Sequence, residues 1–335
     1  MDGVRAILLA ISTVAAAQSW IPQTSGTNES LRGVSAVSPQ IAWASGTKGT
    51  VLKTTDGGST WRKAGPSGAA DLDFRDIETV DGNTTYLLSS GPGPASRIYK
   101  TTDGGSNWAL YPNTDRDGFW DAIAFWDSTH GILLGDPVNG RFTILTTSDG
   151  ITWQTQKGPS AEKDEGAFAA SGTCLFTRGT REAWFATGGP TGGRVFHTSD
   201  GGQTWSVAKT PIRHDSANAG IFSLGFSDGR HGVAVGGDYS KPAEAMANIA
   251  LSEDGGKTWT KPAGAPSGYR SAVTYLSGAD IWLAVGTSGS DVSRDGGKTW
   301  TNFGDVAYNA VSFTSLGAGW AVGPNGAVAR FDSSR

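Results

Sequence analysis

The sequence predicts an all-β fold: a seven-bladed β-propeller of four-stranded antiparallel blades. Three observations lead to it. One short turn motif recurs six times, the copies are spaced about one blade apart, and the apolar strands between them can be counted to seven. Glycine supplies 49 of the 335 residues, which fits a chain with many tight turns, and 37% of the residues are hydrophobic, enough for a substantial core.

Each copy of the turn motif, here called a box, has an Asp, one or two Gly, a polar residue and a Trp. The aspartates recur every 41 to 54 residues. Asp accepts hydrogen bonds from turn amides, Gly allows positive φ, and the Trp that follows is placed to pack between blades. The boxes therefore predict structural turns and not metal or acid sites. They are TTDGGSTW (54–61), TTDGGSNW (101–108), TTSDGITW (146–153), TSDGGQTW (198–205), SEDGGKTW (252–259) and SRDGGKTW (293–300).

The third box lacks one glycine, so its turn is expected to be tighter or irregular. Between boxes the order of strands is constant, with a first strand, a second strand rich in Trp or Gly, and a third that runs into the next box. The seven first strands are expected to begin near Leu31, Phe74, Phe119, Cys174, Ile221, Tyr269 and Ala310.

The chain ends without a fourth strand for its last blade. Residues 18–22, whose sequence is Gln-Ser-Trp-Ile-Pro, resemble the strand that follows a box. We therefore expect the N-terminal strand to pair with the last blade and close the ring, which removes the exposed strand edges.

The first 17 residues predict a secretory signal peptide, with Arg5, an apolar run from Ala6 to Ala17 and cleavage before Gln18. The run is too short for a spanning helix. We expect an exported protein, periplasmic or extracellular, whose mature chain does not span a membrane and forms a single propeller over residues 18–335. The one cysteine, Cys174, lies in an apolar run and is expected to be a buried, inert thiol.

Composition and motifs exclude several kinds of partner. The net charge of −4 argues against nucleic acid, because phosphate binding needs a basic surface. The four histidines show no metal-ligand spacing and no glycine-rich dinucleotide motif is present, so neither a metal nor a cofactor is expected.

Charged and aromatic residues gather where first strands begin and where second strands end. In a propeller these positions share one face, opposite the boxes. Three arginines from separate blades would form an anion site, because guanidinium groups match carboxylates, although each Arg can instead pair with a neighbouring Asp. The long loops 157–173 and 238–248 are expected to rim a pocket on this face. The candidate binding residues are Arg32, Arg75, Asp76, Trp120, Asp121, Asp136, Glu165, His214, Asp215, Asp238, Tyr269 and Arg270.

The boxes, the strand starts Leu-Arg-Gly (31–33), Phe-Arg-Asp (74–76) and Tyr-Arg-Ser (269–271), and the count of seven together resemble the BNR or Asp-box propellers, in particular the photosystem II stability/assembly factor-like family. The resemblance covers essentially the whole mature chain. It implies an arginine patch for partner binding, at Arg32, Arg75 and Arg270 by matching position.

The leading hypothesis is a non-enzymatic exported scaffold that binds a protein, an anionic ligand or a carbohydrate on this face, with no catalytic residues. The rival is a glycoside hydrolase of the sialidase-like class. It would use the arginines to bind a substrate carboxylate, Tyr269 or Tyr308 as nucleophile and an acidic residue as acid/base, or two of the aspartates as a carboxylate pair. Seven blades, where sialidases usually have six, count against it.

Overall fold

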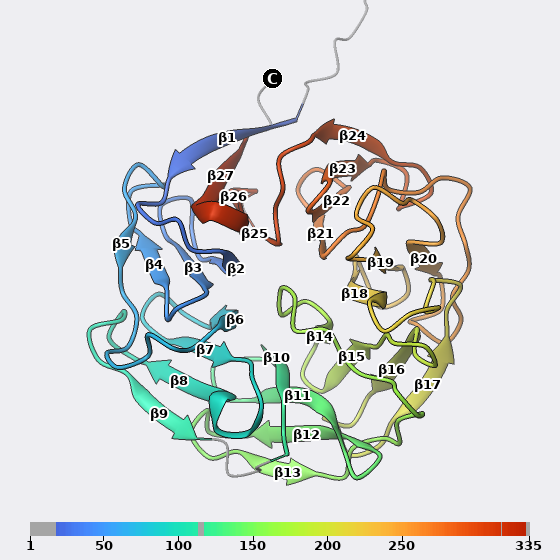
Figure 1. Cartoon of the computed structure of the whole chain (residues 1–335), viewed down its shortest axis with the longest axis horizontal. Helices are drawn as coiled ribbons and strands as arrows, with labels where there is room; N and C mark the ends of the chain where they lie inside the picture. The colour runs from blue at the N-terminus through green and yellow to red at the C-terminus, as the bar shows by residue number, and fades with distance from the viewer. Residues whose placement is uncertain (1–17, 113–116, 316, 333–335) are drawn as a thin grey trace, which may run out of the picture.

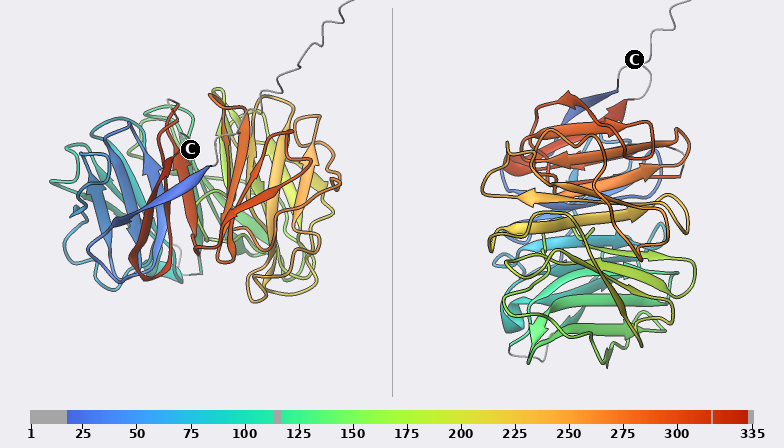
Figure 2. Two further views of the ribbon diagram at one scale, coloured as in Figure 1. Left: turned by 90° about the horizontal axis from the view of Figure 1, so that it is seen from above. Right: turned by 90° about the vertical axis from the view of Figure 1, so that its right-hand side faces the viewer.

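The computed structural model describes residues 18–112, 117–315 and 317–332. The predicted signal peptide, residues 1–17, lies outside the described residues. Seven antiparallel sheets form a ring around a central channel, as Figure 1 shows, and Figure 2 shows the ring from the side. The predicted seven-bladed propeller is confirmed.

The strands follow the predicted order from the channel outward, and each first strand begins within three residues of its expected position. Two short 3-10 turns, η1 (Gly93–Ala95) and η2 (Pro324–Gly326), lie between strands. The first four blades are β2 (Leu31–Ala36), β3 (Ala42–Gly46), β4 (Val51–Thr54), β5 (Arg62–Lys63); β6 (Phe74–Thr79), β7 (Thr85–Ser89), β8 (Arg97–Thr101), β9 (Ala109–Pro112); β10 (Trp120–Phe125), β11 (Gly131–Val138), β12 (Arg141–Thr147), β13 (Gln154–Gln156); and β14 (Leu175–Arg178), β15 (Glu182–Ala186), β16 (Arg194–Thr198), β17 (Ser206–Lys209).

The remaining blades are β18 (Ala219–Phe226), β19 (Gly232–Asp238), β20 (Ile249–Ser252); β21 (Ala272–Leu276), β22 (Ile281–Gly286), β23 (Gly289–Ser293), β24 (Thr301–Gly304); and β25 (Ala310–Phe313), β26 (Gly319–Val322), β27 (Ala327–Asp332), β1 (Ser19–Thr24). In the fifth blade the outer strand is reduced to one bridge between Leu251 and Thr260. Pro262 follows closely, and proline cannot donate a ladder hydrogen bond.

The N-terminal strand closes the ring as predicted. β1 pairs antiparallel with β27, from Ser19 opposite Asp332 to Thr24 opposite Ala327. Figure 1 shows the two strands side by side at the junction of the first and last parts of the chain. The last blade is therefore built from both ends of the chain.

Tryptophans pack between neighbouring blades. The Trp of each box joins the apolar cluster shared with the preceding blade, and Trp20 of β1 takes the same place between the sixth and seventh blades. Burial of these large rings between sheets is the main contact that holds adjacent blades together. The box tryptophans are Trp61, Trp108, Trp153, Trp205, Trp259 and Trp300.

The boxes are hydrogen-bonded turns. In the first, Asp56 accepts from the hydroxyl of Thr60 at 2.7 Å, from the amide of Thr60 at 2.9 Å and from the hydroxyl of Thr54 at 2.9 Å. These bonds lower the pKa of Asp56 to about 2. In the third box, Asp149 accepts from the amides of Ile151 and Thr152, two and three residues ahead instead of four. The tighter turn predicted from the missing glycine is confirmed.

Polar side chains connect the innermost strands of successive blades. These strands have a free edge at the channel, and an unpaired buried N–H is costly. At several junctions a side chain of one blade accepts the hydrogen bond of a backbone N–H in the next. The pairs are Ser35 with Thr79, Asp76 with Ile123, Ser223 with Val273 and Ser312 with Ala36.

Residues 168–173, here called the plug, cross the channel on the face opposite the boxes. The hydroxyl of Ser171 donates to the carbonyl of Ser271 in the sixth blade at 2.9 Å, and the hydroxyl of Thr173 donates to that of Ser223 in the fifth at 2.7 Å. The ring of Phe168 stacks on Phe222 with centroids 3.9 Å apart. Figure 1 shows the segment before β14 reaching into the middle of the ring. The plug thus contacts blades on opposite sides of the channel at this end.

Candidate binding site

Two of the predicted arginines meet at one aspartate on the face that carries the plug, here called the arginine face. Arg32 begins β2 and Arg75 begins β6 in the next blade, so their guanidinium groups approach from neighbouring strand starts. The Nε of Arg75 donates to Asp73 at 2.8 Å, whereas the Nε of Arg32 lies 4.0 Å from the other oxygen of Asp73. Both arginine side chains are 30% exposed.

One carboxylate thus faces two guanidinium groups, so the trio has one positive charge in excess. Arg75 is held further by a bond from Nη1 to the carbonyl of Ala169 in the plug, at 3.1 Å. The side chain of Arg32 makes no hydrogen bond to any described residue, and its Nε is buried. Burial, and then the charge of Arg75, lower the pKa of Arg32. An anion with two oxygens would satisfy this guanidinium and balance the charge.

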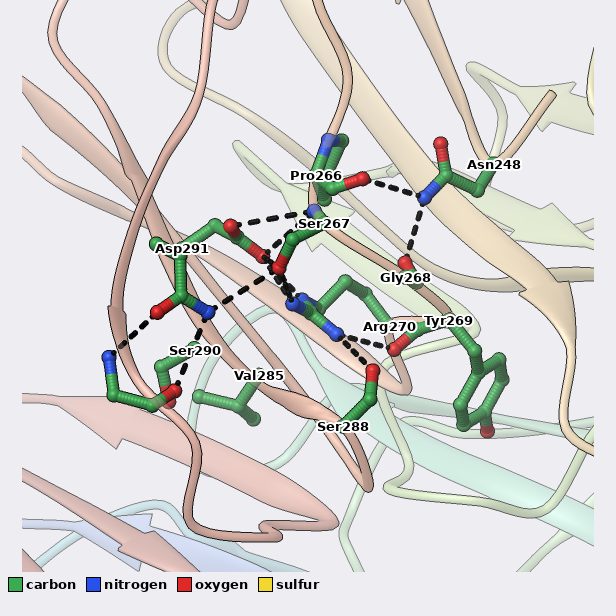
Figure 3. A network of polar contacts seen from close by, with 12 residues as sticks. Asn248, Pro266, Ser267, Gly268, Tyr269, Arg270, Val285, Ser288, Ser290 and Asp291 are labelled. Carbon is green, nitrogen blue, oxygen red and sulfur yellow. Dashed lines mark hydrogen bonds and ion pairs between the residues drawn. The ribbon is translucent and has the colours of Figure 1, made fainter. Parts of the chain in front are cut away.

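Arg270 does not join the pair. Its side chain is fully buried and forms an ion pair with Asp291 of β23, with Nε at 2.6 Å from the carboxylate. Its Nη1 donates to the hydroxyl of Ser288 and its Nη2 to that of Ser267, at 2.8 and 2.7 Å. Figure 3 shows the guanidinium enclosed by these partners. The predicted trio of accessible arginines is therefore reduced to a pair, and Arg270 supports the 266–270 loop instead.

Tyr269 lies on the other side of this loop. Figure 3 shows its ring directed away from the Arg270 network. The side chain is buried, and burial raises the pKa of its hydroxyl. The nearby charge of Arg32 offsets part of this rise. Among the described residues the Tyr269 hydroxyl has no hydrogen-bond partner.

Two of the predicted aspartates, Asp76 and Asp121, are buried inside the ring, and Asp136 is partly buried. Asp76 is 3% exposed and accepts from the amides of Ile77 and Ile123, each at 2.8 Å, so it is a structural link between blades. Burial raises its pKa to about 7. Burial also raises the pKa of Asp121 well above its ordinary value and, despite a hydrogen bond from the amide of Ala167, that of Asp136 to about 6.

The other acidic candidates are tied to partners. Glu165 is paired with the buried Arg194 and accepts from Thr187, and Asp238 accepts from Ser216 and Ser240. Asp215 pairs with Arg213, at 3.0 Å between Nε and the carboxylate. Arg194 and Arg213 were not predicted as partners of these acidic residues, because the positions of residues in the sequence do not show which arginine pairs with which acid.

The last two candidates differ in exposure. Trp120 is 4% exposed and packs in the apolar cluster between the second and third blades. His214 is exposed, and its Nδ1 lies 3.3 Å from the carbonyl of Pro190.

The long loop 157–173 rims a cavity of about 760 Å³ on this face, as expected, with Asp136, Glu162 and Phe168 in its lining, whereas the loop 238–248 contributes no residue to that lining. The described residues bring no three His, Cys, Asp or Glu side chains together in a metal-binding group. No helix in the described part of the chain is long and apolar enough to cross a membrane. Cys174 is buried, and its pKa is raised well above the ordinary value.

No family model matches the chain, and no curated protein matches it. Solved structures resemble it in fold. YCF48 bound to a D1 peptide has a TM-score of 0.65 at 19% identity, covering 93% of this chain and 96% of that chain. YCF48 from Cyanidioschyzon merolae has a TM-score of 0.65 at 17% identity, covering 96% of this chain and 100% of that one.

A streptogramin B lyase structure resembles the chain almost as well, with a TM-score of 0.64 at 12% identity over 96% of this chain and 99% of that chain. At these identities the likeness shows a shared propeller fold alone. One fold thus carries both a peptide-bound protein and a lyase, so function has to be argued from the site.

Proposed function

We propose that this protein is an exported, non-enzymatic scaffold that binds a carboxylate of a protein partner at Arg32 and Arg75. The observation that carries the proposal is the unequal pairing at Asp73. Two partly exposed arginine side chains share one carboxylate, and the side chain of Arg32 makes no hydrogen bond to the described residues. A peptide carboxylate, from a C-terminus or an acidic side chain, suits this arrangement.

The resemblance to YCF48, a protein whose structure holds a D1 peptide, supports a peptide as the ligand. The plug supports it as well. Because residues 168–173 cross the channel beside Arg75, a ligand at this face would lie on the surface of the ring, as a peptide chain can.

The hydrolase alternative has less support from the geometry. A sialidase-like site needs three arginines around one carboxylate, and Arg270 is buried against Asp291. Both candidate nucleophiles, Tyr269 and Tyr308, are buried, and burial raises the pKa of Tyr308 to about 12. Release of sugar from a sialoside panel by the purified protein would favour this alternative over the scaffold.

The test is selection from a library of peptides with free C-termini, followed by affinity measurement. We expect selected peptides to carry a terminal or side-chain carboxylate. The Arg32→Gln variant should lose about tenfold or more in affinity, since bonds to charged groups contribute about 1.5–3 kcal/mol. Arg62→Gln, an exposed arginine on the outer strand β5, is the control of equal charge. Equal binding by both variants would refute the proposal.

A further inference from the structure

A second cavity lies at the opposite end of the channel, near the boxes. Its volume is about 470 Å³, and residues from the innermost strand of every blade line it. Ser171 and Thr173 of the plug form part of its lining, so the plug separates it from the arginine face. It is therefore distinct from the site proposed above.

The cavity holds two carboxyl groups without a basic counterpart. Asp76 and Glu78 are its two carboxylates, and no Lys, Arg or His is among its lining residues. Asp76 is bound by backbone amides of two strands. Glu78, which is partly exposed, has no hydrogen-bond or ion-pair partner among the described residues. Its carboxyl group is thus free to meet a ligand.

Aromatic side chains line the same cavity as this carboxyl group. Phe176 and Tyr275 stand at the same strand position as Glu78 in their own blades, since the three residues pair with Trp184, Trp282 and Tyr86 of the second strands. All three line the cavity and are partly exposed. The faces of aromatic rings attract organic cations.

The cation that fits is an organic ammonium ion. A carboxylate with aromatic walls matches an ammonium group on a short apolar chain, whereas calcium takes 6–8 oxygen ligands and magnesium demands an octahedral set, which two carboxylates do not supply. From this cavity we infer that the channel end near the boxes is a binding site for an alkylammonium ion, with Glu78 as the counter-charge.

In the unliganded cavity a proton can neutralise Glu78. Burial, and then the charge of Asp76, raise the pKa of Glu78 well above its ordinary value. In the empty cavity Glu78 therefore keeps its proton to a higher pH than an ordinary Glu does, and an ammonium ion that binds competes with that proton. Binding should be tighter at pH 8 than at pH 5.

The experiment uses 1-butylammonium chloride as the probe, titrated calorimetrically into the mature protein, with 1-butanol as the uncharged counterpart and calcium chloride as the metal. We expect one butylammonium per chain, with affinity about tenfold higher at pH 8 than at pH 5, and little heat from butanol or calcium. Glu78→Gln should lower the affinity about tenfold or more. Phe176→Leu should weaken it while leaving the counter-charge in place.

Glu253→Gln is the matched control, because Glu253 is an exposed acid of the fifth box on the same face. It should bind as the wild type does. Equal affinities for Glu78→Gln and Glu253→Gln would overturn the inference, and so would equal binding of butanol or a calcium ion that displaces the amine. Circular dichroism of each variant separates a lost site from a lost fold.

Discussion

Asp73 decides how much positive charge the arginine face offers. It lies between Arg32 and Arg75, so its carboxylate competes with any anionic ligand for both guanidinium groups. We predict that Asp73→Asn raises the affinity for a carboxylate peptide, because one unit of charge is no longer neutralised. Fluorescence anisotropy of a selected peptide measures this. Weaker peptide binding by Asp73→Asn would contradict the prediction. It would show that Asp73 contributes more by orienting the two arginines than it costs by neutralising their charge.

Arg270 belongs to the stability of the fold. Replacing it with alanine leaves Asp291, which is 1% exposed, without its guanidinium partner. Breaking a buried ion pair in this way costs about 3–5 kcal/mol. Urea denaturation should show this loss for Arg270→Ala, whereas Arg62→Ala on the exposed strand β5 should lie within about 0.5 kcal/mol of the wild type. Similar midpoints for the two variants would contradict the assigned burial.

Glu78 makes stability depend on pH. Its pKa is raised in the folded state, so the folded protein binds more protons than the unfolded chain above the ordinary pKa of Glu. The free energy of unfolding should therefore fall as pH rises from about 4 toward 8. In Glu78→Gln this fall is predicted to be smaller, with a higher melting temperature at pH 8 and little change at pH 5. If the melting temperatures of the wild type and of Glu78→Gln changed with pH in the same way, the prediction would be contradicted.

The spacing of residues in the sequence predicted where the first strands begin. It did not predict which acidic residue pairs with each arginine. Arg32, Arg75 and Arg270 stand at equivalent positions, and only the first two share an acid, because Asp73 lies beside Arg75 while Asp291 reaches Arg270 from another strand. A side chain's exposure depends on such long-range contacts, which no repeat pattern encodes.

At the scale of elements, the boxes were the most predictable part. Each is a local turn whose hydrogen bonds join residues a few positions apart, so the sequence determines it directly, down to the tighter turn at Asp149. The path of the plug across the channel was not predictable from the sequence. Residues 157–173 were expected to rim a pocket, and that they also cross the channel follows from contacts with Arg75, Ser223 and Ser271 in distant blades.

Gly172 tests the position of the plug. Its φ is +78°, and a Cβ at this residue would lie 2.1 Å from Oδ1 of Asp76. Gly172→Ala should therefore destabilise the protein by more than the ~1–2 kcal/mol that positive φ alone costs an L-residue. Gly82→Ala, where nothing lies within 4 Å, is the control. Chemical denaturation that ranks the two variants equally would show that the plug does not occupy the channel.

For the whole molecule, ring closure by the N-terminal strand was predictable because Trp20 repeats the pattern of a box tryptophan. In the structure Trp20 packs on Phe331 and Tyr308, with ring centroids 5.3 and 5.5 Å away, and donates from Nε1 to Ser290 at 3.0 Å. The seven-fold count likewise follows from the repeats, since each unit must bury its faces against two neighbours.

Removal of residues 18–26 from the mature protein should expose the edge of β27 and the cluster around Trp20. We predict a fall in melting temperature of about 5 °C or more, because a whole strand pairing and an inter-blade ring are lost. Differential scanning calorimetry measures it. An unchanged melting temperature would mean that β1 does not close the ring in solution.

Export is a prediction of the sequence that the described residues do not reach. Cleavage before Gln18 would leave β1, which begins at Ser19, complete. Mass spectrometry of the protein secreted by a bacterial host should give an N-terminus at Gln18. A chain retained in the cytoplasm with residues 1–17 attached would contradict the signal-peptide interpretation.

The central claim is that Arg32 is a contact for a carboxylate of a partner. The most direct measurement is a calorimetric titration of one selected peptide, with its free carboxylate and with that carboxylate amidated, into the wild type and into Arg32→Gln. The account predicts that amidation weakens binding to the wild type about tenfold and has little effect on Arg32→Gln. Amidation and the substitution each remove the same ion pair, between Arg32 and the peptide carboxylate. Equal effects of amidation on both proteins would contradict it.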